Sequence, residues 1–240
     1  IANQKALDIA NINAETKIAG GEVELRNGKP TGMLIDNAMD LVENKIPGIA
    51  DTLAIRYYHE LEKECFALGL TSLQDCGISE HTIELIEKAQ QEKKISMKIF
   101  ALLSDDSSSY ETWMKKGRYT NGSLTVGGYK VYADGALGSR GACLLKDYSD
   151  KPGWKGFLLS SIEHFDSLAQ RLAKTNLQMC THAIGDSGNR QLLNIYASVL
   201  KNKNDRRWRI EHAQVVDSAD FSIFREYSII PSVQPTHATS

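Results

Sequence analysis

The segment GGYKVYADG at residues 127–135 decides the expected fold, because an apolar strand here carries charged side chains. Side chains alternate along a strand, so Lys130, Tyr132 and Asp134 are predicted to share one face. Burying a lysine without a partner is costly, and for Lys130 alone an outward side chain that reaches solvent is the commoner arrangement. Asp134 at the end of the strand weakens that alternative and favours a polar site there.

Strands and helices are expected to alternate on both sides of this segment. The other expected strands are LTSLQDCG (70–77), ISMKIFALLSD (95–105), LQMCTHAIGD (177–186), WRIEHAQVV (208–216) and SIIPSVQP (228–235). Helices are predicted at 52–68, 80–93, after a capping box at 160–163, near 189–200 and near 218–227. The alternation predicts an α/β fold with a parallel sheet covered by helices. It supplies about six of the eight strand–helix units of a (β/α)8 barrel of the TIM type.

Residues 1–50 have a different pattern. The stretch GGEVELRNGKPTGMLID (20–36) alternates and is interrupted by glycine and asparagine, which predicts a hairpin. We expect residues 1–50 to form an insertion packed beside the barrel and residues 51–240 to form the partial barrel.

Composition narrows the function classes. The chain has 240 residues, a formal net charge of −2, and 42% hydrophobic and 24% charged residues, which is typical of a globular protein without a basic surface for nucleic acid or anionic lipid. No run approaches the roughly 18 apolar residues of a membrane span, and residues 1–15 lack secretory signal features. Four widely spaced cysteines favour reduced thiols and a cytoplasmic location. An incomplete barrel exposes sheet edges, so self-association into a homo-oligomer is a further expectation.

Two histidines follow strands next to the one that carries Lys130. His182 lies in THAIGD and His212 in IEHAQ, each at the end of its predicted strand. One such histidine is commonly a satisfied core group, but two beside an inward lysine and an aspartate indicate a metal site, since imidazole is a preferred ligand of zinc. Nearby polar residues either orient these ligands or cap helices and loops, and both alternatives stay open: Asp186, Glu211 and Gln214.

Several phrases along the chain together carry a family resemblance. They are NQKALDIANI (3–12), GGEVELRNGKPTGML (20–34), LGLTSLQDCG (68–77), KVYADGALGSRGA (130–142), THAIGDSGN (181–189), RIEHAQVV (209–216) and PSVQPTHATS (231–240). The chain resembles the amidohydrolase superfamily, in particular amidohydrolase family 3, the YtcJ-like branch that includes N-substituted formamide deformylases. Each phrase is weak alone, whereas their combination spans nearly the whole chain.

The resemblance implies a (β/α)8 barrel with one or two divalent metals, usually zinc, at the strand ends. By this comparison Lys130 becomes carboxylated, and the metal ligands are Lys130, His182 and His212. The implied catalytic residues are His212, His237 and Asp134, and the implied substrate-binding residues are Arg140, Gln234 and Gly135. The family's HxH pair would lie before Ile1 and its last-strand aspartate beyond Ser240.

The expected activity is hydrolysis of a non-peptide C–N bond in a small amide, formamide or cyclic amide. The alternative is a catalytically inactive structural fragment of such an enzyme, because the HxH pair and the last aspartate are missing from this sequence. A nucleophile-based hydrolase is a weaker alternative, since the sequence has no GxSxG elbow and Cys180 lies in an apolar strand.

Overall fold

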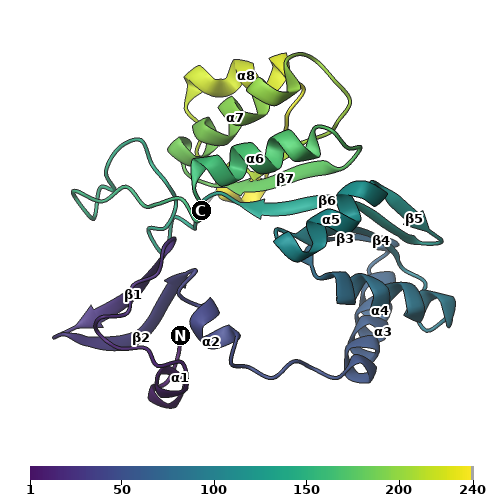
Figure 1. The fold of residues 1–240 in the computed structure, drawn as a ribbon, viewed down its shortest axis with the longest axis horizontal. Coiled ribbons are helices and arrows are strands. Elements are labelled where there is room, and N and C mark those ends of the chain that lie inside the picture. The colour runs from purple at the N-terminus through teal and green to yellow at the C-terminus, as the bar shows by residue number, and fades with distance from the viewer. Residues whose placement is uncertain (239–240) are drawn as a thin grey trace.

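The centre of the molecule is a curled, mostly parallel β-sheet in a computed structural model that describes residues 1–238 (Figure 1). Each parallel strand pairs with the next along the chain, and the short antiparallel β5 (Tyr119–Asn121) flanks β6. The parallel strands are β3 (Ser72–Ile78), β4 (Lys98–Ser104), β6 (Leu124–Tyr132), β7 (Gln178–Ala183), β8 (Arg209–His212) and β9 (Ile230–Ser232). Sequential parallel pairing with helical crossovers is the arrangement of a (β/α) barrel, so the predicted incomplete barrel is confirmed.

Helices connect most of these strands and cover the sheet (Figure 1). They are α3 (Asp51–Ala67), α4 (Glu80–Gln91), α5 (Ser107–Lys116), α6 (Ile162–Leu172), α7 (Asp186–Leu200) and α8 (Phe221–Glu226), with 3-10 turns η1 (Ser218–Asp220) and η2 (Pro235–Ala238). None of the helices within residues 1–238 is long and apolar enough to cross a bilayer.

Two details of the helices differ from the sequence-based expectation. Helix α5 and strand β5 were not predicted, because α5 is mostly polar and its large inward side chains are only Tyr110 and Trp113. The cap of α6 is Ser161, whose hydroxyl accepts the His164 N–H, so the predicted box beginning at Ser160 is one residue too early. Local polar runs contain several residues able to cap a helix, and packing of the apolar face selects among them.

The main hydrophobic core lies between the sheet and its helices. The largest fully buried side chains come from helices and strands alike: Ile83, Ile86, Leu102, Leu103, Leu124, Tyr129, Phe165, Leu172, Leu177, Met179, Tyr196 and Trp208. The predicted apolar face of α6, with Phe165, Leu168, Ala169 and Leu172, is buried in this core. Burial of this face orients α6 on the sheet and holds the strand ends that carry the polar site.

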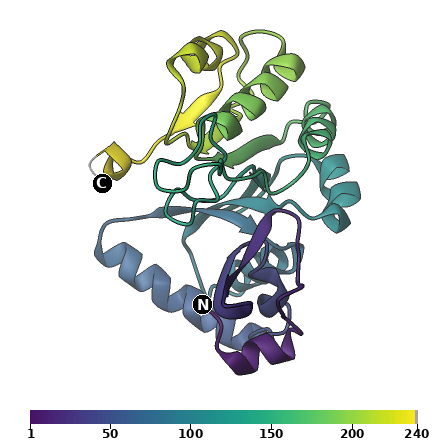
Figure 2. The ribbon, with the colours of Figure 1, turned by 90° about the vertical axis from the view of Figure 1, so that its left-hand side faces the viewer.

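The N-terminal segment packs around a hydrophobic cluster of its own, formed between Ala2 and Val42, and is called here the small unit. Figure 2 shows it at the end of the molecule away from α7 and α8. It contains α1 (Gln4–Ile9), α2 (Asp40–Glu43) and the predicted hairpin of β1 (Gly21–Arg26) and β2 (Lys29–Asp36). The hairpin turns at Asn27 and Gly28, which both have positive φ, as a two-residue type I′ turn requires. The assignment of residues 1–50 as an inserted domain stays a prediction.

A long segment, residues 133–161, joins β6 to α6 and contacts this small unit. It contains no helix or strand, and its isolated bridges are Asp134 with Leu158 and Tyr148 with Lys151. The side-chain amide of Asn37 donates to the carbonyl of Leu159 at 3.1 Å. The carboxyl end of β6 is therefore covered by a loop that the small unit contacts.

Candidate active site

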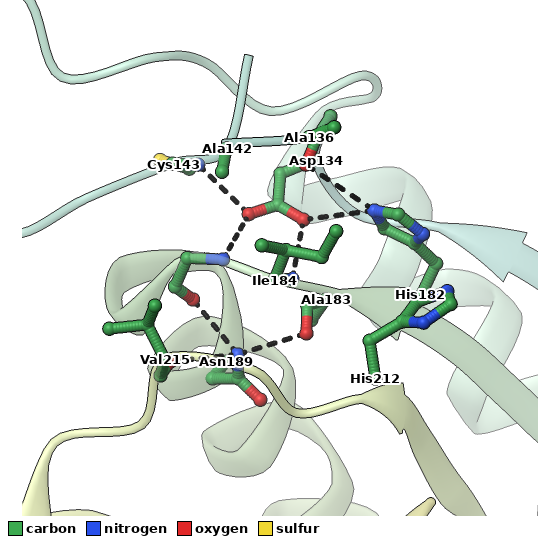
Figure 3. A network of polar contacts seen from close by, with 12 residues as sticks. Asp134, Ala136, Ala142, Cys143, His182, Ala183, Ile184, Asn189, His212 and Val215 are labelled. Carbon is green, nitrogen blue, oxygen red and sulfur yellow. Dashed lines mark hydrogen bonds and ion pairs between the residues drawn. The ribbon is translucent and has the colours of Figure 1, made fainter. Parts of the chain in front are cut away.

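The predicted polar residues gather at the carboxyl ends of β6, β7 and β8. In the sheet register Tyr132 pairs with His182, and Ala183 pairs with His212. The rings of His182 and His212 meet edge to face with centroids 4.7 Å apart (Figure 3). Two imidazoles that were 30 positions apart in the sequence are thus neighbours because parallel strands align their carboxyl ends at one edge.

His182 is largely buried, with 13% of its side chain exposed. Burial, together with the positive charges of Lys130 and His212, lowers its pKa to about 4. Its Nε2 lies 3.4 Å from the carbonyl oxygen of Gly135 and 3.5 Å from Asp134 Oδ1. The ring is therefore neutral near pH 7, which is the protonation state that binds a metal ion.

His212 is held in one orientation by Gln234. The Nδ1–H of His212 donates to Gln234 Oε1 at 2.6 Å, which leaves the Nε2 lone pair available. The backbone of His212 has φ of +74° and that of Ala213 has φ of +41°, a strained conformation for residues other than glycine. Gln234, predicted to bind substrate, thus contacts a candidate metal ligand in this structure.

Lys130 is buried inside the barrel, with 5% of its surface exposed, so the outward-facing alternative is wrong. Within residues 1–238 its ammonium forms no hydrogen bond or ion pair, and it lies over the ring of Tyr132, 4.5 Å from the centroid. Burial lowers the pKa of Lys130, and the negative charge of Glu211 opposes this shift. The ammonium is thus buried without an ion-pair partner among residues 1–238, and burial disfavours its charged form.

Asp134 connects three segments at the end of β6. Its carboxylate accepts the backbone N–H groups of Cys143, Ile184 and Gly185 at 2.8–2.9 Å (Figure 3). Burial raises the pKa of Asp134 to about 6, and these N–H groups oppose the increase. Because both oxygens are used by backbone donors, Asp134 organises the site as well as facing His182.

The remaining predicted residues, from the resemblance or from the sequence pattern, lie farther from this centre or serve the loop. Arg140 pairs with Asp150 on the exposed loop after β6, with Nη2 and Oδ2 2.7 Å apart. The ring of His237 lies 6.0 Å from that of His212, centroid to centroid. Asp186 does not contact His182: it is the first residue of α7, and its carboxylate accepts the backbone N–H of Leu145 at 2.8 Å.

Gly135 is approached closely by a side chain of the small unit. A Cβ on Gly135 or on Gly141 would collide with the carboxylate of Asp36. Asp36 Oδ2 is buried without a hydrogen-bond partner among residues 1–238, and burial raises the pKa of this carboxyl group. The sequence analysis missed Asp36, because nothing in a hairpin pattern shows that its last residue reaches another segment.

Asn189 is a second residue that the sequence analysis did not single out. Its side-chain amide is fully buried in α7 and donates to the carbonyls of Ala183, Gly185 and Val215 at 2.9–3.2 Å (Figure 3). It thereby ties the segment after His182 to the segment after His212. A polar residue on the inner face of a helix pattern is the signal that would have found it.

The donor set fits a divalent metal in part. His182 and His212 supply two adjacent imidazoles, and Lys130 is the buried group beside them. No cluster of three or more histidine, cysteine or acidic side chains suited to a metal occurs within residues 1–238. A metal held by this chain would therefore need an oxygen ligand of another kind, such as a modified lysine.

The fold is an incomplete (β/α) barrel with polar residues at its strand ends, and comparison with known proteins gives the family. The amidohydrolase family profile matches residues 1–239, and the chain belongs to that family.

Curated relatives match nearly the whole chain. It is 32% identical to LONG AFTER FAR-RED 3 of Arabidopsis thaliana and 28% identical to YtcJ of Bacillus subtilis, with 99% of the chain and 43% and 46% of those proteins covered. It is 26% identical to an N-substituted formamide deformylase of Arthrobacter pascens, over 90% of the chain and 42% of that protein. The chain thus spans less than half the length of these relatives.

The fold also matches a solved structure. An uncharacterised metal-dependent hydrolase from Pyrococcus furiosus superposes with a TM-score of 0.76 at 22% identity, covering 99% of this chain and 48% of that protein.

Proposed function

We propose that this protein is a metal-dependent amidohydrolase that cleaves a non-peptide C–N bond in a small amide, formamide or cyclic amide. The observation that carries the proposal is the contact of His182 with His212, 4.7 Å between ring centroids, at adjacent strand ends beside the buried Lys130. Membership of the amidohydrolase family and the likeness to a formamide deformylase support the bond type.

His182, His212 and Lys130 are the residues that would hold the metal, and zinc suits the two imidazoles. The lowered pKa of Lys130 favours its free amine. That amine attacks CO₂, forms an N–C bond and releases one proton, so a costly buried cation becomes an anionic oxygen ligand. When bound, such a metal supplies a water of lowered pKa and polarises a substrate carbonyl.

Other residues of the chain prepare this centre for a neutral substrate. Gln234 holds the proton of His212 on Nδ1, and Asp134 fixes the loop that covers β6. His237, near His212, is proposed to stabilise the negative charge that develops on the substrate oxygen, with Arg140, Gly135 and Gln234 on the substrate side. The proposed partner is a small molecule in the cytoplasm, and a homo-oligomer remains a proposal.

Metal content tests the ligand assignment directly. The chain is purified with zinc and bicarbonate, and bound zinc is measured for the native protein, the variant His182→Ala with His212→Ala, and the control His81→Ala. His81 is an exposed histidine that pairs with Asp51, 30 positions away in the sequence. We expect zinc in the native chain and the control and its loss in the double variant, and equal zinc in all three would overturn the assignment.

Two further measurements address the lysine and the reaction. A carbamate signal in ¹³C NMR, after growth with labelled bicarbonate, is expected for the native chain and absent in Lys130→Met. Formate release from N-substituted formamides, measured on the full-length protein, tests the bond type. Hydrolysis of esters but not of any amide would refute the proposed substrate class.

A second candidate is that this chain on its own is a structural unit without catalysis. The observation in its favour is that residues 1–238 bring together no group of three histidine, cysteine or acidic residues able to hold a metal. Zinc absent from the native chain as well as from the variants would favour this candidate.

A nucleophile-based mechanism has less support. Burial raises the pKa of the Cys180 thiol to about 12, so this thiol stays protonated and unreactive near neutral pH.

A further inference from the structure

A cavity at the opposite ends of the strands gathers arginine side chains that the proposed hydrolysis does not use. It has a volume of about 360 Å³ and is lined by Arg118, Thr175, Asn176, Leu177, Gln178, Asp205, Arg206 and Arg207. Gln178 begins β7, whereas His182 lies four residues further along that strand. At about 3.3 Å per residue, the cavity wall is about 13 Å from the histidine.

The charges around this cavity leave an excess of positive charge. Arg207 pairs with Asp205, its Nε lying 2.9 Å from Oδ1. Arg118 and Arg206 form no ion pair with any acidic group among residues 1–238. Two guanidinium charges at this end of the sheet are therefore not neutralised by an acidic side chain of residues 1–238.

Arg206 is fixed in place before any ligand arrives. Its Nη1 and Nη2 each donate at 2.5 Å, to the carbonyls of Thr175 and Ala173. Arg118 is exposed, stacks at 5.6 Å on the ring of Phe100, and its backbone N–H donates to Asn176 Oδ1 at 2.7 Å. A guanidinium whose orientation is already set loses little entropy on binding an oxyanion, which favours a specific site over diffuse attraction.

Gln178 supplies an independent observation on the same wall. The residue is 7% exposed, and its Oε1 is buried without a hydrogen-bond partner within residues 1–238. A buried acceptor left unpaired is unfavourable, so a ligand that donates a hydrogen bond to this oxygen would bind more tightly than one that does not. A ligand that satisfies both features carries anionic oxygens for the arginines and a hydroxyl for Gln178.

We propose that this cavity binds a phosphate group, either as free orthophosphate or on a phosphomonoester. Orthophosphate near neutral pH presents several charged oxygens and keeps at least one proton, so it also offers a hydroxyl donor. A phosphomonoester, whose second pKa is about 6, offers that donor in its protonated fraction. Within residues 1–238 the guanidinium of Arg118 donates to no protein acceptor, so its planar fork suits bidentate binding of phosphate oxygens. Sulfate has the same shape and charge but no proton to donate, which makes it a matched probe.

Isothermal titration of the chain at fixed ionic strength tests the site with orthophosphate, glycerol 3-phosphate and sulfate. We expect saturable binding of phosphate, and sulfate weaker by about tenfold, which corresponds to about 1.4 kcal/mol. Tighter binding of glycerol 3-phosphate than of orthophosphate would assign the site to a phosphomonoester, and the reverse order would assign it to the free ion.

Variants distinguish specific binding in this cavity from nonspecific electrostatic attraction of anions to the protein surface. Arg118→Gln is expected to weaken phosphate binding about tenfold, while Arg225→Gln, at an exposed arginine of α8, leaves it unchanged. Gln178→Leu is expected to abolish the preference for phosphate over sulfate, an effect that a structural role alone would not produce. Absence of saturable binding, or equal losses in Arg118→Gln and Arg225→Gln, would overturn the proposal.

Discussion

Replacement of Asp134 by alanine should destabilise the chain through its backbone contacts. The carboxylate accepts three N–H groups, from Cys143, Ile184 and Gly185, and two of these donors are buried. Each donor left without an acceptor costs roughly 1–3 kcal/mol, and water entering the space recovers part of this. We expect Asp134→Ala to lower the free energy of unfolding by about 3–5 kcal/mol.

Urea denaturation followed by tryptophan fluorescence measures this loss. Asp134→Asn keeps one oxygen acceptor and should cost about 1–3 kcal/mol. The control is Asp147→Ala, an exposed aspartate that, among residues 1–238, accepts only the N–H of Gly153, with an expected change within about 0.5 kcal/mol. A loss below about 1 kcal/mol for Asp134→Ala would refute the view that this carboxylate holds the loop and the two strand ends together.

The pH dependence of the same variants tests the direction of the pKa shift. Because the folded pKa of Asp134, about 6, exceeds its ordinary value of 3.8, the folded state holds the proton more tightly than the unfolded state. This contribution to stability is present below pH 4 and is lost as the pH rises through 6. Native protein should therefore lose about 2–3 kcal/mol relative to Asp134→Asn between pH 4 and pH 7. If the native protein instead gains stability relative to Asp134→Asn as the pH rises, the three N–H donors lower the pKa of Asp134 by more than burial raises it.

Three other predictions concern single residues of the site. Asn189→Ala removes the side-chain donor from the carbonyl groups of Ala183 and Val215, whereas Gly185 keeps the backbone N–H of residue 189, and should cost about 2–4 kcal/mol in chemical denaturation. A negligible loss would count against the role of this side chain in joining the two segments. Cys180 should resist iodoacetamide in the native protein at pH 8 while the exposed Cys76 reacts, as peptide mass mapping would show. Gln234→Leu should weaken zinc binding by about 10–100-fold if Gln234 orients His212, and unchanged affinity would exclude that role.

The sequence predicted those helices and strands whose hydrophobic periodicity is visible within a short stretch of chain. Period-2 runs predicted the strands around Lys130, His182 and His212, and the apolar spacing of α6 predicted its buried face. Helix α5 was not predicted, because most of its side chains are polar and only a few of them are buried. Hydrophobic periodicity reports burial of a whole face, so an element with few apolar residues gives little signal.

The sequence alone determined the alternating strands and helices, the hairpin within residues 20–36, and the candidate residues at successive strand ends. Each follows from side-chain chemistry within a short window of chain. Only the tertiary structure decided that His212 meets Gln234, that Asp134 accepts N–H groups from residues up to 51 positions away, and that Asp36 reaches the loop after β6. The reason is physical: sheet register and packing of the small unit set which distant groups become neighbours, and a window of sequence contains neither.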